Sequence, residues 1–410
     1  MYMERIVYHA DVDHCYAQIE LREHPEWRGR PLAVGGHQED RNGIILAKCP
    51  IAKKAGVKTG MALWQARGLV PDLRIAYPNM RLYVETTDHI REIFSEYTDL
   101  VEDFGVDESW LELTGCTTDA EKTAREMQER IKRETGLTVS FGVAWNKTIA
   151  KLGSDLYKPN GMAVINKENF KSVVWPLPAE DLLMVGRATK VKLNRMAIRT
   201  IGDIANVDPE LLKHSLGING LALSAYANGL ENSPVRQETY SRPEKSIGNS
   251  WTAPRDLLCD DDVWIVLNGL CEGVSTRLRK GGYLATVIDF SYRTTELHWA
   301  SHQRKLSYAT DITQEIQKVS FELYRERGTL PLRSIGVRAT GLIPATTPEQ
   351  IDFFANIEKR DRQRAIDNTL DGLRERFGYD SIQRGTRYMD SDLGKLNALR
   401  HTVHPVGYQG

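Results

Sequence analysis

Residues 6–17 read IVYHADVDHCYA, an apolar run that passes directly into alternating carboxylates. A second stretch, residues 105–113, reads GVDESWLEL and again sets carboxylates on an otherwise apolar strand. A carboxylate on a core strand is costly unless a cationic group lies against it. Either stretch alone also fits aspartates at solvated strand ends. Side by side, the two strands would gather hard oxygen ligands suited to Mg²⁺, and paired ions of this kind support phosphoryl transfer.

The bulk properties are typical of a cytoplasmic multidomain protein. A chain of 410 residues is too long for one ordinary core, and its apolar and charged fractions, 41% and 27%, are those of a globular protein. No apolar stretch approaches the length of a bilayer span, and residues 1–5 lead directly into a strand, so we expect neither a membrane anchor nor a signal peptide. Five cysteines without metal-type spacing fit a reducing cytosol. The net charge of −1 does not exclude nucleic-acid binding, because a basic stripe on one face is sufficient.

Strands and helices alternate through the first part of the chain. Apolar spacing predicts helices at about residues 86–100 and 119–135 and a strand over residues 137–143, which indicates an α/β or α+β unit. From about residue 180 to 236 we expect helices joined by glycine turns, at Gly186, Gly217 and Gly220. Such turns can present backbone N–H groups to a phosphate, although plain helix packing explains the same pattern.

A polar linker at residues 234–243 precedes a different pattern. Residues 246–343 read as β-α-β-β-α-β, a ferredoxin-like split βαβ arrangement. Its strands predict a basic sheet face, for which a solvated surface without function is the alternative: Arg293, Arg304, Lys305, Arg333 and Arg338. Beyond residue 344 we expect a linker, a short apolar cluster and an amphipathic helix at about residues 360–377. Ile366, Leu370 and Leu373 lie on one face of that helix.

Six motifs occur in order between about residues 5 and 345. They are residues 11–20 (DVDHCYAQIE), 106–111 (VDESWL), 142–151 (GVAWNKTIAK), 158–161 (KPNG), 245–248 (KSIG) and 333–338 (RSIGVR). Together they resemble the motifs of the Y-family DNA polymerases, most closely the bacterial DinB (DNA polymerase IV) branch. Six motifs in the correct order are not explained by chance.

The resemblance implies an α+β multidomain fold of the right-hand type and a translesion polymerase. Its expected parts are a palm (1–20 and 80–178), small fingers (21–79), a helix-hairpin-helix thumb (179–236), a linker (237–243), a ferredoxin-like (βαββαβ) little finger (244–344) and a C-terminal tail (345–410). Such an enzyme adds dNTPs to a primer 3′-OH on primer-template DNA, with low fidelity and lesion bypass. We expect a cytoplasmic monomer that does not associate with membranes.

The same resemblance assigns the catalytic carboxylates. Asp11 and Asp107 would bridge two Mg²⁺ ions. Glu108 would hold the ion that lowers the pKa of the primer 3′-OH, and the carbonyl of Val12 would complete the ligands of the nucleotide-side ion. Asp13, although prominent in the first motif, is expected to be structural.

Further roles concern the nucleotide and the DNA. Tyr16 would be the steric gate, a ring that leaves no room for a ribose hydroxyl, with Cys15 beside it. Lys53 and Lys158 would neutralise the triphosphate, and Lys53 does so as a point charge where the family often has arginine. The residues expected to contact DNA are Gly186, Gly217, Gly220, Lys245, Ser246, Arg293, Arg304, Arg333 and Arg338.

Several positions depart from the family pattern. Cys15 stands where phenylalanine is usual and is expected to loosen contacts near the nucleotide. Ala47 and Pro50 replace a threonine and a tyrosine that touch the phosphates, which puts nucleotide affinity in doubt, although Lys48 is a possible substitute. Met184 replaces a glycine of the first thumb hairpin and predicts a weaker grip on phosphate.

The apolar cluster after residue 345 resembles the peptide by which bacterial polymerases bind the sliding clamp. Residues 350–354 read QIDFF, and their expected anchors are Gln350, Ile351, Phe353 and Phe354. A linker that presents two aromatic side chains to a pocket suits this mode of binding.

Two other functions remain open from the sequence. One is a different palm-type nucleotidyl transferase, such as a cyclase, which shares the acidic strands but needs neither a thumb nor a clamp peptide. The other is a homologue that binds DNA and the clamp without chemistry. The three intact carboxylates argue against it, while Ala47 and Pro50 keep it open.

Overall fold

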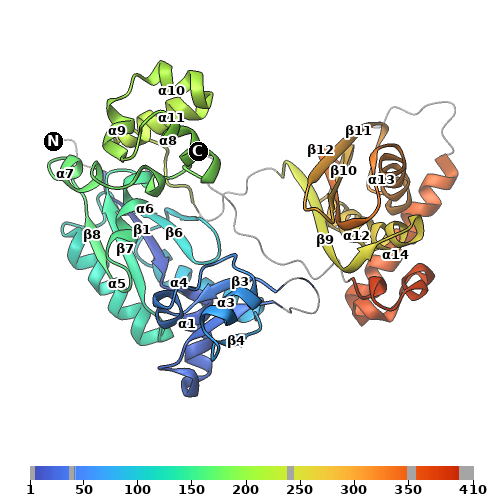
Figure 1. Ribbon diagram of the computed structural model, residues 1–410, viewed down its shortest axis with the longest axis horizontal. Coiled ribbons are helices and arrows are strands. Elements are labelled where there is room, and N and C mark those ends of the chain that lie inside the picture. The colour runs from blue at the N-terminus through green and yellow to red at the C-terminus, as the bar shows by residue number, and fades with distance from the viewer. Residues whose placement is uncertain (1–4, 37–40, 42, 238–243, 349–356, 397–410) are drawn as a thin grey trace. The chain divides into compact units, whose positions relative to one another are not determined.

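The computed structural model describes residues 5–36, 41, 43–237, 244–348 and 357–396. The described chain forms two compact units, one of residues 5–36 and 44–237 and the other of residues 41, 43, 244–348 and 357–396. The first is coloured blue to green and the second, apart from residues 41 and 43, yellow to red in Figure 1.

A five-stranded sheet organises the first unit, in the order β5-β6-β1-β7-β8. The strands are β1 (Val7–Val12), β5 (Val101–Asp103), β6 (Glu108–Glu112), β7 (Val139–Ala144) and β8 (Met162–Val164). Central β1 is buried throughout and pairs antiparallel with both β6 and β7. Because successive side chains point to opposite faces, Tyr8 and Ala10 join one core cluster and Val7 joins another.

Three capped helices cover this sheet (Figure 1). They are α4 (Met80–Ser95), α5 (Ala120–Thr135) and α6 (Lys147–Leu156). Side chains of Asn79, Asp119 and Asn146 accept the N-terminal N–H groups of these helices. The helix expected at residues 119–135 is confirmed. The one expected at residues 86–100 begins earlier because Asn79 caps it.

Shorter elements complete the first unit. A three-stranded sheet in the order β3-β2-β4 contains β2 (Leu32–Gly35), β3 (Ile45–Lys48) and β4 (Arg74–Ala76). The helices that accompany it are α1 (Cys15–Glu23), α2 (Pro50–Lys54) and α3 (Leu63–Leu69). After α7 (Phe170–Val174), a helical cluster follows, formed by α8 (Arg187–Arg195), α9 (Ile201–Asn206), α10 (Pro209–Leu216) and α11 (Ile218–Ala227). The helical stretch predicted from about residue 180 is therefore confirmed.

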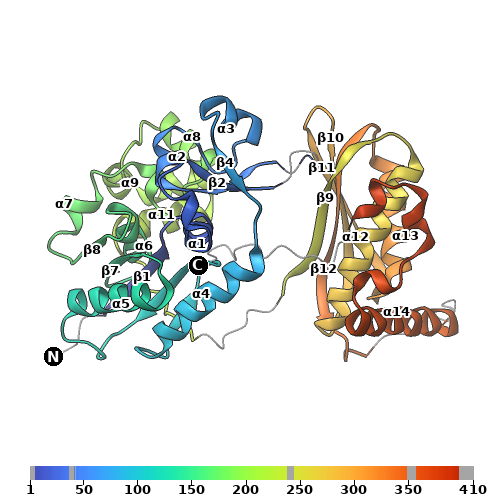
Figure 2. The ribbon, with the colours of Figure 1, turned by 90° about the horizontal axis from the view of Figure 1, so that it is seen from below.

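The second unit begins as the predicted β-α-β-β-α-β succession. Its elements are β9 (Ser246–Leu257), α12 (Asp260–Lys280), β10 (Tyr283–Thr294), β11 (Trp299–Thr310), α13 (Thr313–Arg327) and β12 (Leu332–Pro344). The strand order is β11-β10-β12-β9 with every neighbour antiparallel, so each helix joins parallel strands that have another strand between them. This is a split βαβ arrangement, and α12 and α13 lie on one side of the sheet (Figure 2).

The C-terminal segment corrects the expectation of a separate tail. The predicted amphipathic helix exists as α14 (Ile357–Phe377), but it packs beside α12 and α13 (Figure 2). Its buried residues are Asp367 and Arg374, whereas Ile366 is 47% exposed. Its side chains form ion pairs with the rest of the unit: Arg279–Asp367, Arg279–Asp371, Arg364–Asp311, Arg360–Glu315 and Arg374–Glu272. Apolar spacing did not predict this packing, because charged side chains form the contact between α14 and the rest of the unit.

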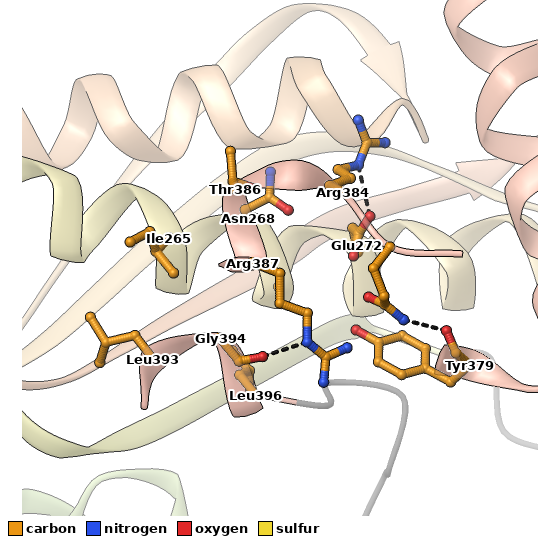
Figure 3. Close-up of a pocket in the computed structure, with 12 residues that line it drawn as sticks. Ile265, Asn268, Glu272, Tyr379, Arg384, Thr386, Arg387, Leu393, Gly394 and Leu396 are labelled. Carbon is orange, nitrogen blue, oxygen red and sulfur yellow. Dashed lines mark hydrogen bonds and ion pairs between the residues drawn. The ribbon is translucent and has the colours of Figure 1, made fainter. Parts of the chain in front are cut away.

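The turns after α14 close over α12. Arg384 Nε donates to Glu272 at 2.7 Å, and Arg387 Nε donates to the Gly394 carbonyl. Figure 3 shows these residues around a cavity of about 20 Å³, which has room for about one water molecule. Leu393 and Leu396 join the core of the unit. Residues 357–396 are therefore an integral part of the second unit.

Candidate active site

The two acidic stretches lie side by side, as the sequence predicts. Asp11 on β1 is directly opposite Glu108 on β6, and the Val12 N–H donates to the Asp107 carbonyl at 2.9 Å. Asp11 shares a sheet face with Val7, which belongs to the core cluster under α6. Two carboxylates from adjacent strands, and that of Asp107 just before β6, therefore gather at one end of the central pair.

Two lysines lie against these carboxylates. Lys158 Nζ forms an ion pair with Asp11 and another with Asp155, the latter at 2.8 Å. Lys151 Nζ, from α6, forms an ion pair with Glu108. Since Asp11 is 7% exposed, a cationic partner is what its burial requires.

The carboxylates differ in their affinity for protons. Burial raises the pKa of Asp11 to about 7, although the positive charge of Lys158 opposes this shift. Burial, with the charge of Glu108, also raises the pKa of Asp107. Burial acts in the same direction on Glu108, but hydrogen bonds from His9 and Lys151 lower its pKa to about 2. Burial therefore disfavours the charged forms of the two aspartates, while His9 and Lys151 stabilise the charge of Glu108.

The chemistry of this donor set fits Mg²⁺. Within the described ranges, no three His, Cys, Asp or Glu side chains are already arranged as metal ligands, and lysines pair with Asp11 and Glu108 instead. All three carboxylates supply hard oxygens, the ligands that Mg²⁺ prefers, and a positive charge beside buried Asp11 and Asp107 would offset the cost of their burial. Asp11, Asp107 and Glu108 are accordingly the residues that would hold metal.

Asp13 organises the loop that carries Lys158. Its carboxylate accepts hydrogen bonds from Thr138 Oγ1 at 2.8 Å, Ser140 Oγ at 2.7 Å and the Asn160 N–H at 2.7 Å. Three donors occupy its oxygens, which agrees with a structural role. By fixing Asn160, Asp13 places Lys158 beside Asp11.

Tyr16 is held by a stacked partner. Its ring lies on that of Tyr83 with centroids 4.5 Å apart and planes 13° from parallel. The Tyr83 hydroxyl donates to buried Glu20, which ties α1 to α4. Burial raises the pKa of Tyr16 to about 12, so the phenol is neutral. Cys15 is buried beside it, and burial raises the pKa of its thiol.

Lys53 and Lys158, the two lysines expected to neutralise the triphosphate, both influence the pKa of His14. Burial lowers the pKa of His14, and the charges of Lys53 and Lys158 contribute to that shift. Pro50 takes the first position of α2, where a missing N–H costs nothing, and the Cys49 sulfur accepts from the Ala52 N–H. Pro50, which departs from the family pattern, is thus suited to the first position of this helix.

The predicted thumb glycines differ in geometry. The N–H groups of Gly217 and Gly220 already donate to the carbonyls of Lys213 and Gly217. A Cβ on Gly220 would lie 2.3 Å from the Leu212 carbonyl oxygen, so this glycine permits close packing of α10 on α11. Gly186 caps α8, and Met184 before it has φ +73°, a conformation that favours glycine.

Arg304 does not lie on the open face of the second sheet, which corrects the prediction. It pairs in register with Ile288, a core residue under the helices, and forms ion pairs with Glu322 and Glu326 of α13. Its neighbour Lys305 points to the opposite face and is exposed. Placing both residues on one face overlooked the alternation along a strand.

The other predicted basic residues stay candidates for DNA contact. Arg338 is exposed on the open face and pairs with Asp289 at 3.4 Å. Arg293 Nε donates to the Leu297 carbonyl at 3.2 Å, and Arg333 lies at a register shift in β12. Lys245 and Ser246 stand at the start of β9. The clamp-binding residues Gln350, Ile351, Phe353 and Phe354 lie outside the described residues.

His9, Lys151 and Ser154 are site residues that the sequence reasoning missed. His9 Nε2 lies 3.1 Å from Glu108 Oε2, and its Nδ1 lies 2.8 Å from Ser154 Oγ. A signal existed for His9, because it stands two residues before Asp11 and so shares its face. No comparable signal existed for Ser154, since only the packing of α6 on β1 brings it there.

Fold and site together define a palm-type nucleotidyl-transferring enzyme, and comparison with known proteins specifies the family. Residues 10–155 match the impB/mucB/samB family, and residues 244–353 match the C-terminal domain of that family. The chain belongs to this family, the Y-family polymerases of DinB type. By family it is a DNA-directed DNA polymerase.

Curated relatives cover nearly the whole chain. DNA polymerase IV of Acetivibrio thermocellus is 43% identical over 96% of this chain and 100% of its own length. DNA polymerase IV 2 of Halalkalibacterium halodurans is 34% identical over 98% of this chain and 100% of its own. A solved Y-family DNA polymerase chimera of Dbh and Dpo4 shares the fold, with a TM-score of 0.73 over 83% of this chain and 99% of its own, at 23% identity.

Proposed function

We propose that this chain extends a primer 3′-OH with dNTPs on a DNA template by two-metal phosphoryl transfer, as a low-fidelity translesion enzyme. The observation that carries the proposal is the pairing of Asp11 with Glu108 on adjacent strands, with Asp107 beside them. Bound Mg²⁺ ions would lower the pKa of the primer hydroxyl and stabilise the charge on the transferred phosphate.

The protein's own residues would bind and orient the nucleotide. Lys158 is already in the site, and on dNTP binding it would exchange its ion pair with Asp11 for a phosphate oxygen. Lys53 would add a second point charge from α2. Tyr16, fixed by its stack on Tyr83, would exclude the 2′-hydroxyl of a ribonucleotide.

Low fidelity would follow from the small size of the part expected to form the fingers. Residues 21–79 contain strands of three or four residues and the helices α2 and α3, of five and seven residues. A unit of this size offers little surface for checking the shape of a base pair. The same openness would admit a damaged template base.

DNA would be held mainly through its phosphates. Exposed Lys305 and Arg338 on the open sheet face and the N-terminus of α8 at Gly186 are the groups suited to this. Binding would then be sequence-independent and sensitive to salt. The sliding clamp would be a second partner, reached through residues 350–354.

We further propose that the protein is a cytoplasmic monomer, and this proposal stays a prediction. Among the helices that the structure describes, none combines the length and apolarity needed to cross a membrane.

Single-nucleotide insertion tests the proposal against the cyclase alternative. The protein is incubated with Mg²⁺, a labelled primer-template and one dNTP at a time, for each of the four template bases. We expect addition that follows the template base and stops when EDTA removes the metal. Release of pyrophosphate from a nucleotide without any DNA would instead indicate a cyclase.

A further inference from the structure

His9 is enclosed beneath the carboxylate cluster. Its side chain is fully buried, with its ring 5.4 Å from that of Trp110 at an interplanar angle of 61°. The two ring nitrogens face different partners, Glu108 Oε2 at 3.1 Å and Ser154 Oγ at 2.8 Å. A buried imidazole with both nitrogens engaged has its orientation fixed from two sides.

The protons that Glu108, His9 and Ser154 carry determine which group donates each hydrogen bond between them. The Glu108 carboxylate only accepts, so His9 Nε2 must carry a proton. In a neutral ring, Nδ1 is then an acceptor, and the single proton of Ser154 Oγ must point to it. The Lys151 carbonyl, 2.7 Å from Ser154 Oγ, competes for that proton. Ser154 Oγ can donate to Nδ1 of a neutral ring, or donate to the Lys151 carbonyl and accept from Nδ1–H of a protonated ring, and in both arrangements His9 Nε2 donates to Glu108.

The bond from His9 also selects one oxygen of Glu108. His9 and the Lys151 ammonium both bind Oε2. As far as the described residues go, Oε1 is the oxygen left to meet a metal ion. Lys151 alone would fix this oxygen poorly, because its flexible side chain is a mobile point charge.

We propose that Ser154 and His9 are positioning residues for metal binding, which hold Glu108 with Oε1 presented to an ion. This inference rests on the proposed role of Glu108 as a ligand. Groups that orient a metal ligand from behind typically change metal affinity or activity 10–100-fold when removed. If His9 served only as a ring packed on Trp110, its replacement would lower the stability of the protein and leave its metal affinity unchanged.

Ser154→Ala is the decisive variant because it removes only a hydroxyl. Ser172→Ala is its matched control, since Ser172 Oγ donates to the carbonyl three residues earlier, as Ser154 Oγ can, but Ser172 is exposed on α7. We expect Ser154→Ala to raise the Mg²⁺ concentration for half-maximal insertion about 10-fold. The KM of Ser154→Ala for dNTP at saturating Mg²⁺ should stay unchanged. In Ser172→Ala, neither this KM nor the Mg²⁺ concentration for half-maximal insertion should change.

A direct binding measurement separates this inference from the polymerase mechanism. Mn²⁺ is titrated calorimetrically into the full chain bound to primer-template DNA and a non-hydrolysable dNTP. We expect weaker Mn²⁺ binding for Ser154→Ala and for His9→Phe, with partial recovery in His9→Gln, whose amide can still donate. Unchanged Mn²⁺ affinity in Ser154→Ala, with a wild-type protein that binds Mn²⁺, would overturn the inference alone. A wild-type protein that binds no Mn²⁺ would overturn the two-metal proposal as well.

Discussion

At the residue scale, the packing of Tyr16 supports its proposed role as the steric gate. It stacks on Tyr83, and Tyr83 is anchored through its hydroxyl to buried Glu20. A side chain fixed in this way can discriminate by contact, because it does not rotate away from an added hydroxyl group. Burial of Cys15 next to it holds the start of α1 in place.

Replacing the ring should admit ribonucleotides. We expect Tyr16→Ala to lower the preference for dNTP over NTP by about 100-fold or more, the scale of a steric or buried-group mismatch in a substrate site. Tyr16→Phe, which keeps the ring, is the control and should retain the preference. The measurement is single-nucleotide insertion with each sugar, and unchanged discrimination in Tyr16→Ala would remove Tyr16 from this role.

Carboxylates at the site could be predicted from the sequence because their cost on a buried strand is a local property. Asp11 and Glu108 face each other as expected from two acidic strands. His9 could have been assigned from its place on the same strand face as Asp11. Ser154 could not, since a lone serine in a core usually has a packing role and only the placement of α6 against β1 brings it to His9.

At the scale of elements, β11 separates two neighbouring basic residues. Arg304 turns toward α13 and is neutralised by Glu322 and Glu326, while Lys305 faces the open side of the sheet. The succession of elements was predictable from apolar periodicity. That Arg304 and Lys305 lie on opposite faces follows from the alternation of side chains along a strand, and the pairing of Arg304 with Ile288 determines which of the two faces α13.

This separation predicts different effects on DNA binding. Lys305→Ala should weaken binding to all sequences alike and reduce the slope of log K against log salt concentration by about 1, since one phosphate contact is lost. Arg304→Ala should leave that slope unchanged, because its charge is already paired. Fluorescence anisotropy across a salt series measures both. A larger loss in Arg304→Ala would contradict the assignment of faces.

On the scale of the whole molecule, the second unit includes its C-terminal segment. Asp367 on α14 is 3% exposed and accepts from the Thr313 N–H at 2.8 Å, Arg384 Nη2 at 2.9 Å and Arg279 Nη1 at 3.4 Å. Breaking a buried ionic group by removing one partner leaves uncompensated charges in the interior. The interface therefore depends on complete pairing.

Asp367→Ala should destabilise the second unit by about 3 kcal/mol. The measurement is urea unfolding of the full chain, followed by tryptophan fluorescence. Asp361→Ala is the control, because Asp361 lies on the same helix with a side chain 67% exposed, and it should change stability by less than about 0.5 kcal/mol. Equal, small effects of the two variants would show that α14 is not part of the folded unit.

The clamp peptide predicts an effect on processivity alone. Phe353→Ala with Phe354→Ala should abolish binding to the bacterial sliding clamp and spare distributive synthesis, because the lost rings are anchors for a partner pocket. Phe377→Ala, an exposed aromatic 63% accessible at the end of α14, is the control and should bind the clamp normally. Surface plasmon resonance measures the binding. If the double variant lost synthesis without the clamp as fully as it lost clamp binding, Phe353 and Phe354 would be needed for folding and not for the clamp.

The most direct test of the central claim is primer extension by the wild-type chain beside the double variant Asp107→Ala/Glu108→Ala, with Mg²⁺ and all four dNTPs. We predict template-dependent extension by the wild type and none by the variant, while both bind the primer-template with the same salt dependence. Extension by the double variant would contradict the assignment of the metal site. Binding without extension by the wild type would show that the chain is a DNA-binding homologue without chemistry.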